Sequence, residues 1–318
     1  MAEKNKILVV GSLAYDHVMQ YDGFFKNAMI PGHYNLVVTA SNRAVFYGGC
    51  SGNIAYSLKL LNENPVIMTV AGSDFEEYKN WLTKKGIDSS AVFESDRHLT
   101  ASAFIVTDKQ ENQIVIFDPG AMHSTVPNQS VKNIQYDELA WAIIAPDEPE
   151  RMYNLAKECK ELNIPFIFDP AQQLPMIEDQ KLLEIVQIAE ILIVNKYESD
   201  LLTNKIGVNK DKLAQMVPIY IETRGAEGCS INAQGEVHLI KAVRPMQMMD
   251  PTGCGDAFRA GVLTGLRNNL GIVESAQIGS LMATYSIENF GTQAHSFTMD
   301  EFKQRYYENF GTALFERN

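Results

Sequence analysis

The sequence predicts an α/β protein with a mainly parallel sheet, helices on both faces of that sheet, and a small separate β element. Three observations support this fold class. Short apolar runs alternate with segments of helical spacing for most of the chain, and two glycine-rich clusters each open a helix. The composition, with 46% hydrophobic and 21% charged residues among 318, is that of a globular protein with a sizeable core.

Six short apolar runs, bounded by Gly, Pro, Asp or Asn, are typical of strands buried on both faces. They are residues 7–10, 66–70, 142–145, 166–168, 191–194 and 219–221. Apolar residues at helical spacing predict helices at residues 54–61, 152–162, 182–188, 256–266, 273–289 and 299–307. Strands that alternate with helices in this way favour a parallel sheet covered on both sides.

Two stretches interrupt the alternation and predict a small β lid. The first contains a strand-like run at residues 34–39, and the second is a hairpin of residues 102–107 and 113–117 around a polar turn. We therefore expect a large α/β domain of residues 1–16, 47–98 and 118–318, and a lid of residues 17–46 and 99–117. The alternative is that these strands extend one edge of the main sheet.

The charge balance argues against a nucleic-acid partner. The chain carries 27 basic and 39 acidic side chains, a net charge of −12, whereas a protein that grips a phosphate backbone needs a concentrated basic face. No apolar run is long enough for a membrane span, and the N-terminal run at residues 7–10 is too short for a signal peptide. The four cysteines show no metal-site spacing, so we expect a cytoplasmic protein with reduced thiols.

The segment from Asp250 to Gly261 carries the strongest chemical signal. Gly253 and Gly255 flank a small residue, Cys254, and a helix then begins at the acidic Asp256. Glycines allow close backbone approach, and the first turn of a helix offers unpaired N–H groups at its positive end, which suits phosphate oxygens. An aspartate there can accept a proton from a hydroxyl group. The alternative is that Asp256 only caps the helix.

A second cluster, Gly48–Gly49 followed by Asn53, also opens a helix. The loops after different strands of an open α/β sheet converge on one crevice, so we expect the two clusters to form one site. Taken alone, this segment is equally compatible with a tight loop before a capped helix. Neither cluster matches G-x-x-x-x-G-K-[ST] or G-x-G-x-x-G, which disfavours P-loop enzymes and NAD-binding dehydrogenases.

The two clusters resemble the two signatures of the ribokinase-like (PfkB) carbohydrate kinases. Gly48, Gly49, Asn53 and Ala55 match the first signature; Asp250, Thr252, Gly253, Gly255 and Asp256 match the second. Asn195 and Glu198 match the family's Asn-x-x-Glu, and Gly225 and Gly228 match its Gly-x-x-Gly nucleotide loop. The resemblance spans residues 7 to about 290 and implies a ribokinase-like three-layer α/β sandwich with a β lid.

Within the family, the chain resembles the bacterial adenosine kinases more than the sugar kinases. The similarity rests on Gly11-Ser12 with Asp16-His17, residues 117–122, 169–174 and 258–261, and Gly291-Thr292-Gln293. It implies that the chain phosphorylates the ribose 5′-hydroxyl of a purine nucleoside with ATP, and we expect adenosine as substrate and AMP as product. The alternatives are a sugar kinase for ribose or fructose, and a non-catalytic nucleoside sensor.

The resemblance also implies roles for single residues. Asp256 would be the general base, while the backbone amides of Gly253, Cys254 and Gly255 would form the anion hole for the transferring group. Asp16 would bind the ribose hydroxyls, and Ser12, Gly48, Gly49 and Asn53 would complete the sugar pocket. Phe104 and Phe117 would contact the nucleobase, or alternatively form ordinary lid core, and Gln172 and Gln173 would donate amide hydrogen bonds to the base.

The nucleotide side is implied in the same way. Thr223, Gly225 and Gly228 would bind ATP, and Asn195 with Glu198 would arrange Mg²⁺ and phosphate, Glu198 acting through water. Arg259 would reach a phosphate, with a solvent-exposed or salt-bridged arginine as the alternative. The expected cofactors are therefore ATP and Mg²⁺, and an apolar face of the lid would pair two copies into a homodimer.

Overall fold

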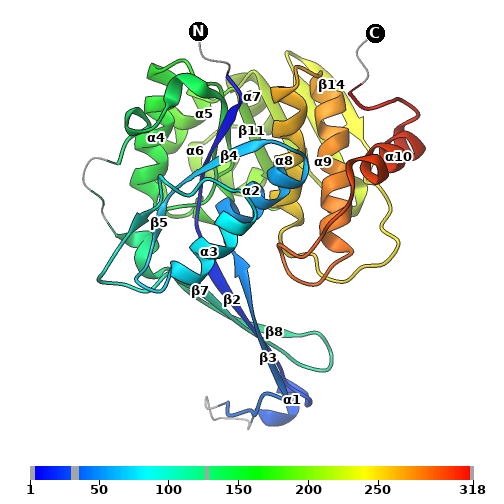
Figure 1. Ribbon diagram of the computed structural model, residues 1–318. Helices are drawn as coiled ribbons and strands as arrows, with labels where there is room; N and C mark the ends of the chain where they lie inside the picture. Colours follow the sequence, from blue (N-terminus) through cyan, green and yellow to red (C-terminus); the bar gives the residue numbers. More distant parts are fainter. Residues whose placement is uncertain (1–3, 30–35, 125, 127–128, 316–318) are drawn as a thin grey trace.

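An eight-stranded sheet between two layers of helices forms the body of the computed structural model, which describes residues 4–29, 36–124, 126 and 129–315 (Figure 1). The strand order is β14-β13-β12-β11-β10-β9-β1-β4. The strands are β1 (Lys6–Val10), β4 (Asn64–Met68), β9 (Leu139–Ile144), β10 (Phe166–Phe168), β11 (Ile191–Asn195), β12 (Ile219–Thr223), β13 (Cys229–Ala233) and β14 (Glu236–Ile240). All neighbours from β4 to β12 pair in parallel, and β13 and β14 add an antiparallel hairpin at the edge.

The six predicted strands are confirmed, because each apolar run overlaps one of the parallel strands, although residues 69–70 and 145 lie beyond the ends of β4 and β9. Alternate residues of these strands point into two separate cores. Leu8, Ile144 and Leu192 face one core, and Ile7, Ile143 and Ile193 face the other, so continuous apolar runs are required. The edge strands β13 and β14 were not predicted, since they carry polar residues between apolar ones.

Helices cover the two faces of this sheet unequally. One face packs against α4 (Pro149–Glu161), α5 (Asp179–Ile188), α6 (Lys196–Ile206) and α7 (Lys210–Met216). The other packs against α2 (Cys50–Leu60), α8 (Cys254–Arg267) and α9 (Ile272–Ile287), with α3 (Glu76–Lys84) beside α2 and α10 (Met299–Phe310) against α9. None of the helices in the described ranges has the length and apolar character needed to cross a membrane.

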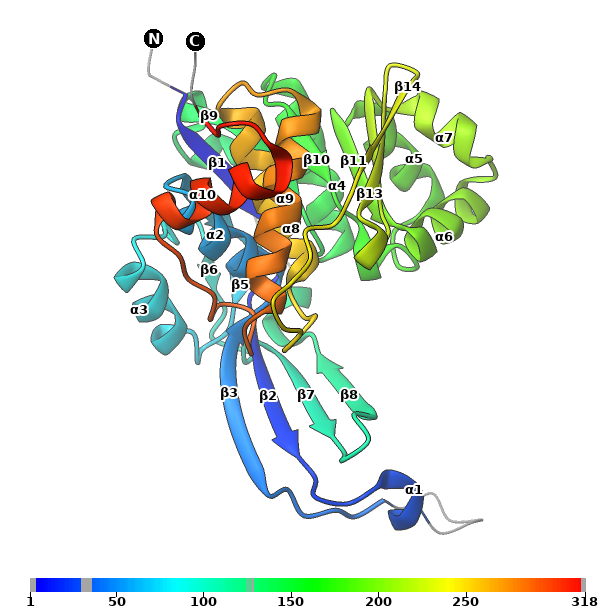
Figure 2. The same cartoon turned by 90° about the vertical axis from the view of Figure 1, so that its right-hand side faces the viewer.

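The lid is a separate four-stranded sheet that projects from the body as an arm (Figure 2). Its order is β3-β2-β7-β8, with β2 (Ala14–Gln20), β3 (Asn42–Gly48), β7 (Ala101–Thr107) and β8 (Gln113–Asp118). The predicted hairpin is confirmed as β7 and β8, and the alternative of extra strands on the main sheet is wrong. A short helix, α1 (Phe25–Ala28), lies near its tip, and a two-stranded sheet of β5 (Val70–Ala71) and β6 (Phe93–Glu94) lies in the body.

The strand predicted at residues 34–39 is wrong where the structure describes it. Residues 36–39 have no regular structure, and residues 34 and 35 lie outside the described residues. The strand from this part of the chain that pairs with β2 is instead β3. The register of the pair places Phe46 opposite Asp16 and Gly48 opposite Ala14. The lid sheet therefore extends beyond the predicted lid limits, at Ala14, Gly48 and Asp118.

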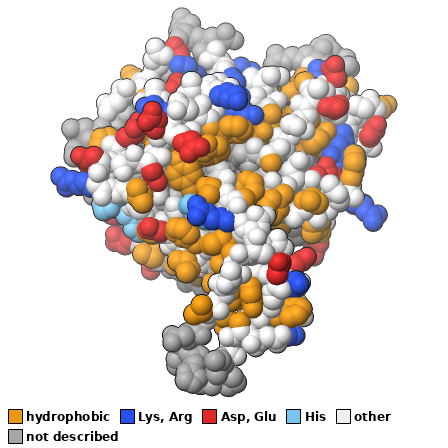
Figure 3. Space-filling model, turned by 60° about the horizontal axis from the view of Figure 1, so that its bottom comes forward, with side chains coloured by type: hydrophobic (Ala, Val, Ile, Leu, Met, Phe, Trp, Pro, Cys, Tyr) orange, Lys and Arg blue, Asp and Glu red, His pale blue; other side chains and the backbone are white. Residues whose placement is uncertain are grey.

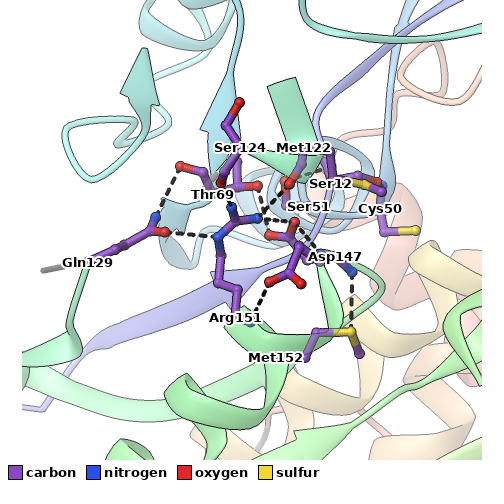
Figure 4. A network of polar contacts seen from close by, with 11 residues as sticks. Ser12, Cys50, Ser51, Thr69, Met122, Ser124, Gln129, Asp147, Arg151 and Met152 are labelled. Atoms are coloured by element: carbon purple, nitrogen blue, oxygen red, sulfur yellow. Dashed lines mark hydrogen bonds and ion pairs between the residues drawn. The ribbon is translucent and has the colours of Figure 1, made fainter. Parts of the chain in front are cut away.

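A buried ion pair anchors the chain where it returns from the lid to the body. The guanidinium of Arg151 bonds Asp147, the carbonyl oxygens of Met122 and Ser124, and the amide oxygen of Gln129 (Figure 4). The other carboxylate oxygen of Asp147 accepts from the Thr69 hydroxyl at 2.8 Å. Because every contact reaches a charged group that is excluded from water, this network holds the segment after β8 against β9 and α4.

Candidate active site

The predicted anion cradle forms at the start of α8. Gly253 is the residue before the helix and has a φ of 78°, and a Cβ there would lie 3.0 Å from the Thr292 side chain, so this position requires glycine. Asp256 lies in the first turn of α8. Gly255 is exposed in the first turn of α8, where backbone N–H groups lack intrahelical partners, and the Cys254 N–H donates to the Pro251 carbonyl at 3.3 Å. The geometry can hold an anion next to a carboxylate.

Asp256 is held by the second glycine cluster, as the sequence predicted when it placed both clusters in one site. The amide nitrogen of Asn53, in α2, donates to one carboxylate oxygen of Asp256 at 2.8 Å. Burial raises the pKa of Asp256 to about 6, while the Asn53 hydrogen bond and the Arg259 charge act in the opposite direction. A carboxyl group with this pKa is largely ionised at neutral pH and remains able to accept a proton.

Asp16 faces this carboxylate from the lid strand β2. Burial, reinforced by the charges of Asp250 and Asp256, raises the pKa of Asp16 to about 7. Gly48 lies directly behind it, because a Cβ at this position would collide with the Asp16 carboxylate and displace it. Gly49 has a φ of 85°, and a Cβ there would lie only 2.5 Å from the Ser12 carbonyl oxygen, so this position also requires glycine.

Ser12 fixes the start of α2. Its hydroxyl accepts from the Cys50 N–H at 3.3 Å, and its carbonyl accepts from the N–H and the hydroxyl of Ser51 at 3.0 and 2.8 Å. Ser12 is only 5% exposed, so it supports the loop that carries the glycines. Burial raises the pKa of the Cys254 thiol to about 11, which agrees with a role for the Cys254 main chain only.

Arg259 adopts the salt-bridged alternative. It is 6% exposed, its Nη2 donates to Asp169 at 2.8 Å, its Nε also contacts that carboxylate, and its Nη1 donates to the Gly255 carbonyl at 3.0 Å. Asp169 follows β10 and is itself buried, so the two charges satisfy each other. Arg259 thus supports the anion cradle from behind.

The two lid phenylalanines lie on opposite faces of the lid sheet. Residues paired in register share a face, and Asp16 pairs with Ala103, which pairs with Phe117. Phe104 pairs instead with His17 and Ile116, and its ring stacks on His17 at 4.7 Å. The structure therefore places Phe104 away from the Asp16 face, contrary to the expectation that both rings contact the base. Phe46 lies on the Asp16 face instead, opposite Asp16 in register.

The two glutamines after β10 differ in exposure. Gln172 is exposed and interacts with the Cys50 thiol, which lies next to Asp256. Gln173 is 8% exposed and its N–H closes a short turn with the Pro170 carbonyl. Of the two, Gln172 therefore offers the open amide on this side of the site.

The nucleotide-side residues lie at the carboxyl ends of β11 and β12. Asn195 and Glu198 form a capping box at the start of α6: the Asn195 side chain accepts from the Glu198 N–H at 2.8 Å, and Glu198 accepts from the Asn195 N–H at 2.7 Å. Asn195, Thr223 and Gly225 line a cavity of about 710 Å³. Gly228 closes the β12–β13 turn, where its φ of 90° and its contact with the Ile240 carbonyl require glycine.

The residues present suit Mg²⁺ only in its water-mediated form. Within the described ranges, no group of three or more His, Cys, Asp or Glu side chains could hold a metal ion. Glu198 contributes one carboxylate beside Asn195, and burial raises its pKa. Mg²⁺ commonly keeps several waters and binds through one or two carboxylates plus substrate phosphates, so this donor set fits that arrangement.

Several contacts that shape the site were not predicted. Asp169 is the partner of Arg259, and Asp250 accepts from the N–H groups of Thr252 at 2.9 Å and Gly291 at 3.2 Å. The Gln293 side chain donates to the Asn53 side-chain oxygen, and the Trp81 indole donates to Gln293. The motifs that contain Asp250 and Gln293 were visible in the sequence, but no local pattern indicates which groups these side chains meet.

Comparisons with known proteins agree with this geometry. The model of the pfkB family carbohydrate kinases matches residues 4–299. A nucleoside kinase of Methanocaldococcus jannaschii is 28% identical over 306 residues, covering 94% of this chain and 96% of that protein. The structure of a Burkholderia thailandensis nucleoside kinase in complex with inosine is 33% identical, with a TM-score of 0.86 over 96% of this chain and 99% of that one. A ribokinase of Haemophilus influenzae is 25% identical, covering 94% of this chain and 97% of the relative.

The raised pKa of Asp16 predicts a pH-dependent cost in stability. Because the folded-state pKa is about 7 and the usual value is 3.8, the folded protein binds more protons between these values, and its stability falls as pH rises through them. We expect Asp16→Asn to increase the free energy of unfolding by about 1–3 kcal/mol at pH 8, and to lose most of that gain near pH 4. Denaturant unfolding at both pH values measures this. An equal effect of Asp16→Asn at the two pH values would contradict it.

Proposed function

Because the chain belongs to the pfkB family of carbohydrate kinases, we propose that it is a nucleoside kinase that transfers the γ-phosphoryl group of ATP to the ribose 5′-hydroxyl of purine nucleosides. The observation that carries the proposal is the placement of Asp256. Its partly buried carboxylate lies in the first turn of α8 beside Gly253–Gly255 and interacts with the charge of Asp16 on the lid. A base, an anion cradle and an acceptor for hydroxyl groups therefore meet in one site.

In the proposed reaction, Asp256 accepts the proton of the ribose 5′-hydroxyl. The 5′-oxygen of the nucleoside at the same time forms a bond to the γ-phosphorus of ATP. The bond from the γ-phosphorus to the bridging oxygen breaks, and ADP leaves with that electron pair. The amides of Gly253, Cys254 and Gly255 stabilise the charge on the transferring group. A pKa of about 6 suits Asp256 to this role, because the carboxylate is ionised before the step at neutral pH.

Nucleoside recognition is proposed to use both domains. The Asp16 carboxylate accepts hydrogen bonds from the ribose hydroxyls, and Gly48, Gly49 and Asn53 form the floor of the sugar pocket. Phe117 on the Asp16 face of the lid and the exposed Gln172 contact the base. The Burkholderia thailandensis relative is described in complex with inosine and with ADP-inosine, which supports purine nucleosides as substrates, with adenosine and inosine as candidates.

ATP is proposed to extend from the Gly253–Gly255 loop toward Thr223, Gly225 and Gly228. The Burkholderia thailandensis relative described in complex with ADP-inosine supports an adenine nucleotide as the phosphoryl donor. Glu198 and Asn195 would hold Mg²⁺ through water, and the ion would neutralise charge on the phosphates. The chain's own residues bind and orient both substrates, and Asp256 carries the proton.

A substrate panel tests the proposal directly. ADP release is measured with ATP and adenosine, inosine, ribose or fructose at equal concentrations. We expect turnover of at least one purine nucleoside with a kcat/KM roughly 10²-fold or more above that for either free sugar, because the base adds binding contacts that the sugars lack. Faster turnover of ribose or fructose would identify a sugar kinase, and no ADP release with any acceptor would favour a nucleoside sensor.

The proposed base is tested by Asp256→Ala. Removal of a general base should lower kcat roughly 10²–10⁴-fold and leave the KM for nucleoside and ATP within a few-fold. Steady-state kinetics on the preferred nucleoside measure both constants. The control is Asp137→Ala, an exposed aspartate just before β9, at the end of the parallel strands opposite the cradle, which should keep the wild-type kcat. Near-normal kcat in Asp256→Ala would remove Asp256 from the mechanism.

We also propose that the outward face of the lid pairs two copies into a homodimer. Phe104, Val45 and Ile116 share the face opposite Asp16 and are 37%, 47% and 63% exposed, an apolar row that a monomer would leave in water. Figure 3 shows apolar side chains gathered along the lid.

The assembly prediction is tested by light scattering. We expect the wild-type chain to run at twice its mass of 35.5 kDa, and Ile116→Glu to run as a monomer, because the charge would be buried unpaired. Val237→Glu is the matched control: Val237 is 64% exposed on β14, far from the lid. A monomeric wild type, or a dimer that survives Ile116→Glu, would contradict the assignment of this face.

A further inference from the structure

A chain of hydrogen bonds runs from α3 to Asp256. The indole N–H of Trp81 donates to the side-chain oxygen of Gln293 at 3.0 Å, and the Gln293 amide nitrogen donates to the Asn53 oxygen at 3.3 Å. The Asn53 amide nitrogen then donates to Asp256 at 2.8 Å. Gln293 and Asn53 are 8% and 5% exposed, so water does not replace these bonds.

The donor-to-acceptor direction of these hydrogen bonds is set at Trp81, the end farthest from Asp256. An amide side chain keeps its shape when its oxygen and nitrogen exchange places, so packing alone does not orient Gln293 or Asn53. An indole N–H can only donate, which turns the Gln293 oxygen toward Trp81 and its nitrogen toward Asn53. Asn53 must then accept with its oxygen and present its nitrogen to Asp256.

Tyr78 enforces the same orientation from a second side. Its hydroxyl donates to the Gly48 carbonyl at 2.8 Å and therefore accepts from the Gln293 nitrogen at 2.6 Å. The ring is fully buried and packs against Tyr47, which stacks on Trp81 at 5.3 Å. Gln293 thus connects the backbone behind Asp16 with the amide that holds Asp256.

We propose that Trp81 and Gln293 are positioning residues, which fix the amide of Asn53 so that it donates to Asp256 and holds the base ionised and aimed at the acceptor hydroxyl. The inference rests on the proposed role of Asp256. Both residues act through Asn53, whose amide nitrogen is the group that reaches the carboxylate.

The other titratable and charged groups around Asp256 come from several elements and are left unchanged by the test. Arg259 follows one turn later on α8 and Asp169 follows β10, while Cys50 and Cys254 lie at the starts of α2 and α8. Asp16 interacts with Asp256 from β2, and Asp250, from the loop before α8, interacts with Asp16. Because Trp81→Phe adds and removes no charged group, a change in the titration of Asp256 in that variant reports the Asn53 contact.

The first test is Trp81→Phe, which keeps an aromatic ring beside Tyr47 and removes the indole donor. We expect kcat to fall roughly tenfold, with KM for nucleoside and ATP within about twofold. Since the Asn53 hydrogen bond lowers the pKa of Asp256, its partial loss should move the acid limb of the kcat profile up by about half a pH unit to one unit. Trp141→Phe on β9 is the matched control and should keep the wild-type profile.

The second test is Gln293→Glu. An ionised glutamate only accepts hydrogen bonds, so the Asn53 side-chain nitrogen would turn toward residue 293. The Asn53 side-chain oxygen would then face the Asp256 carboxylate. We expect kcat to fall roughly 10²-fold, a larger loss than in Trp81→Phe. Thermal unfolding of each variant reports its folding, and calorimetry with the preferred nucleoside reports whether the sugar pocket survives.

Double variants separate this inference from the proposed function. In an Asp256→Ala background, Trp81→Phe should have no further effect on kcat, because its target is gone. A further tenfold loss there, or a folded Trp81→Phe with the wild-type kcat and acid limb, would overturn the positioning role. Near-normal activity of Asp256→Ala alone would instead overturn the assignment of the base.

Discussion

The hydrogen bond from Asn53 to Asp256 joins the first turns of two helices across 203 residues of sequence, and the rest of the site is arranged around it. Both helices start after a glycine with positive φ, Gly49 before α2 and Gly253 before α8. Those backbone turns direct two helix N-termini toward the same end of the sheet. The Gly253 loop can then bind an anion only where a carboxylate, held by Asn53, already stands beside it.

This arrangement concentrates negative charge in a partly buried place, and the structure offsets only part of it. Arg259 neutralises Asp169, and Asn53 donates to Asp256, while the pKa of Asp16 remains raised to about 7 by burial and neighbouring carboxylates. The protein therefore keeps an acceptor available where the proposed substrate brings hydroxyl donors. A buried carboxyl group such as that of Asp16 lowers the free energy of unfolding, and a cost of this kind is common in binding sites.

The fold and the meeting of the two glycine clusters at Asn53 and Asp256 could be predicted because they rest on local patterns. Apolar runs buried on both faces identify parallel strands, and a glycine before an acidic helix start identifies an anion cradle. Residue contacts that depend on register or on distant partners could not be predicted. The register of β7 with β8 places Phe104 and Phe117 on opposite faces of the lid sheet. The hydrogen bond from Trp81 to Gln293 joins residues 212 positions apart in the sequence. Arg259 was visible, but its pairing with Asp169 was not.

The middle of the lid is the parallel pair of β2 and β7, and the chain between β3 and β7 passes through the body as α2, β4, α3 and the β5–β6 pair. A parallel pair between distant segments gains no contacts until the chain between them is already closed. The lid sheet is therefore expected to complete only after the intervening segment of α2, β4 and α3 has folded. The pairing of β2, the strand that carries Asp16, with β7 is thus expected to depend on the prior folding of α2, the helix that carries Asn53.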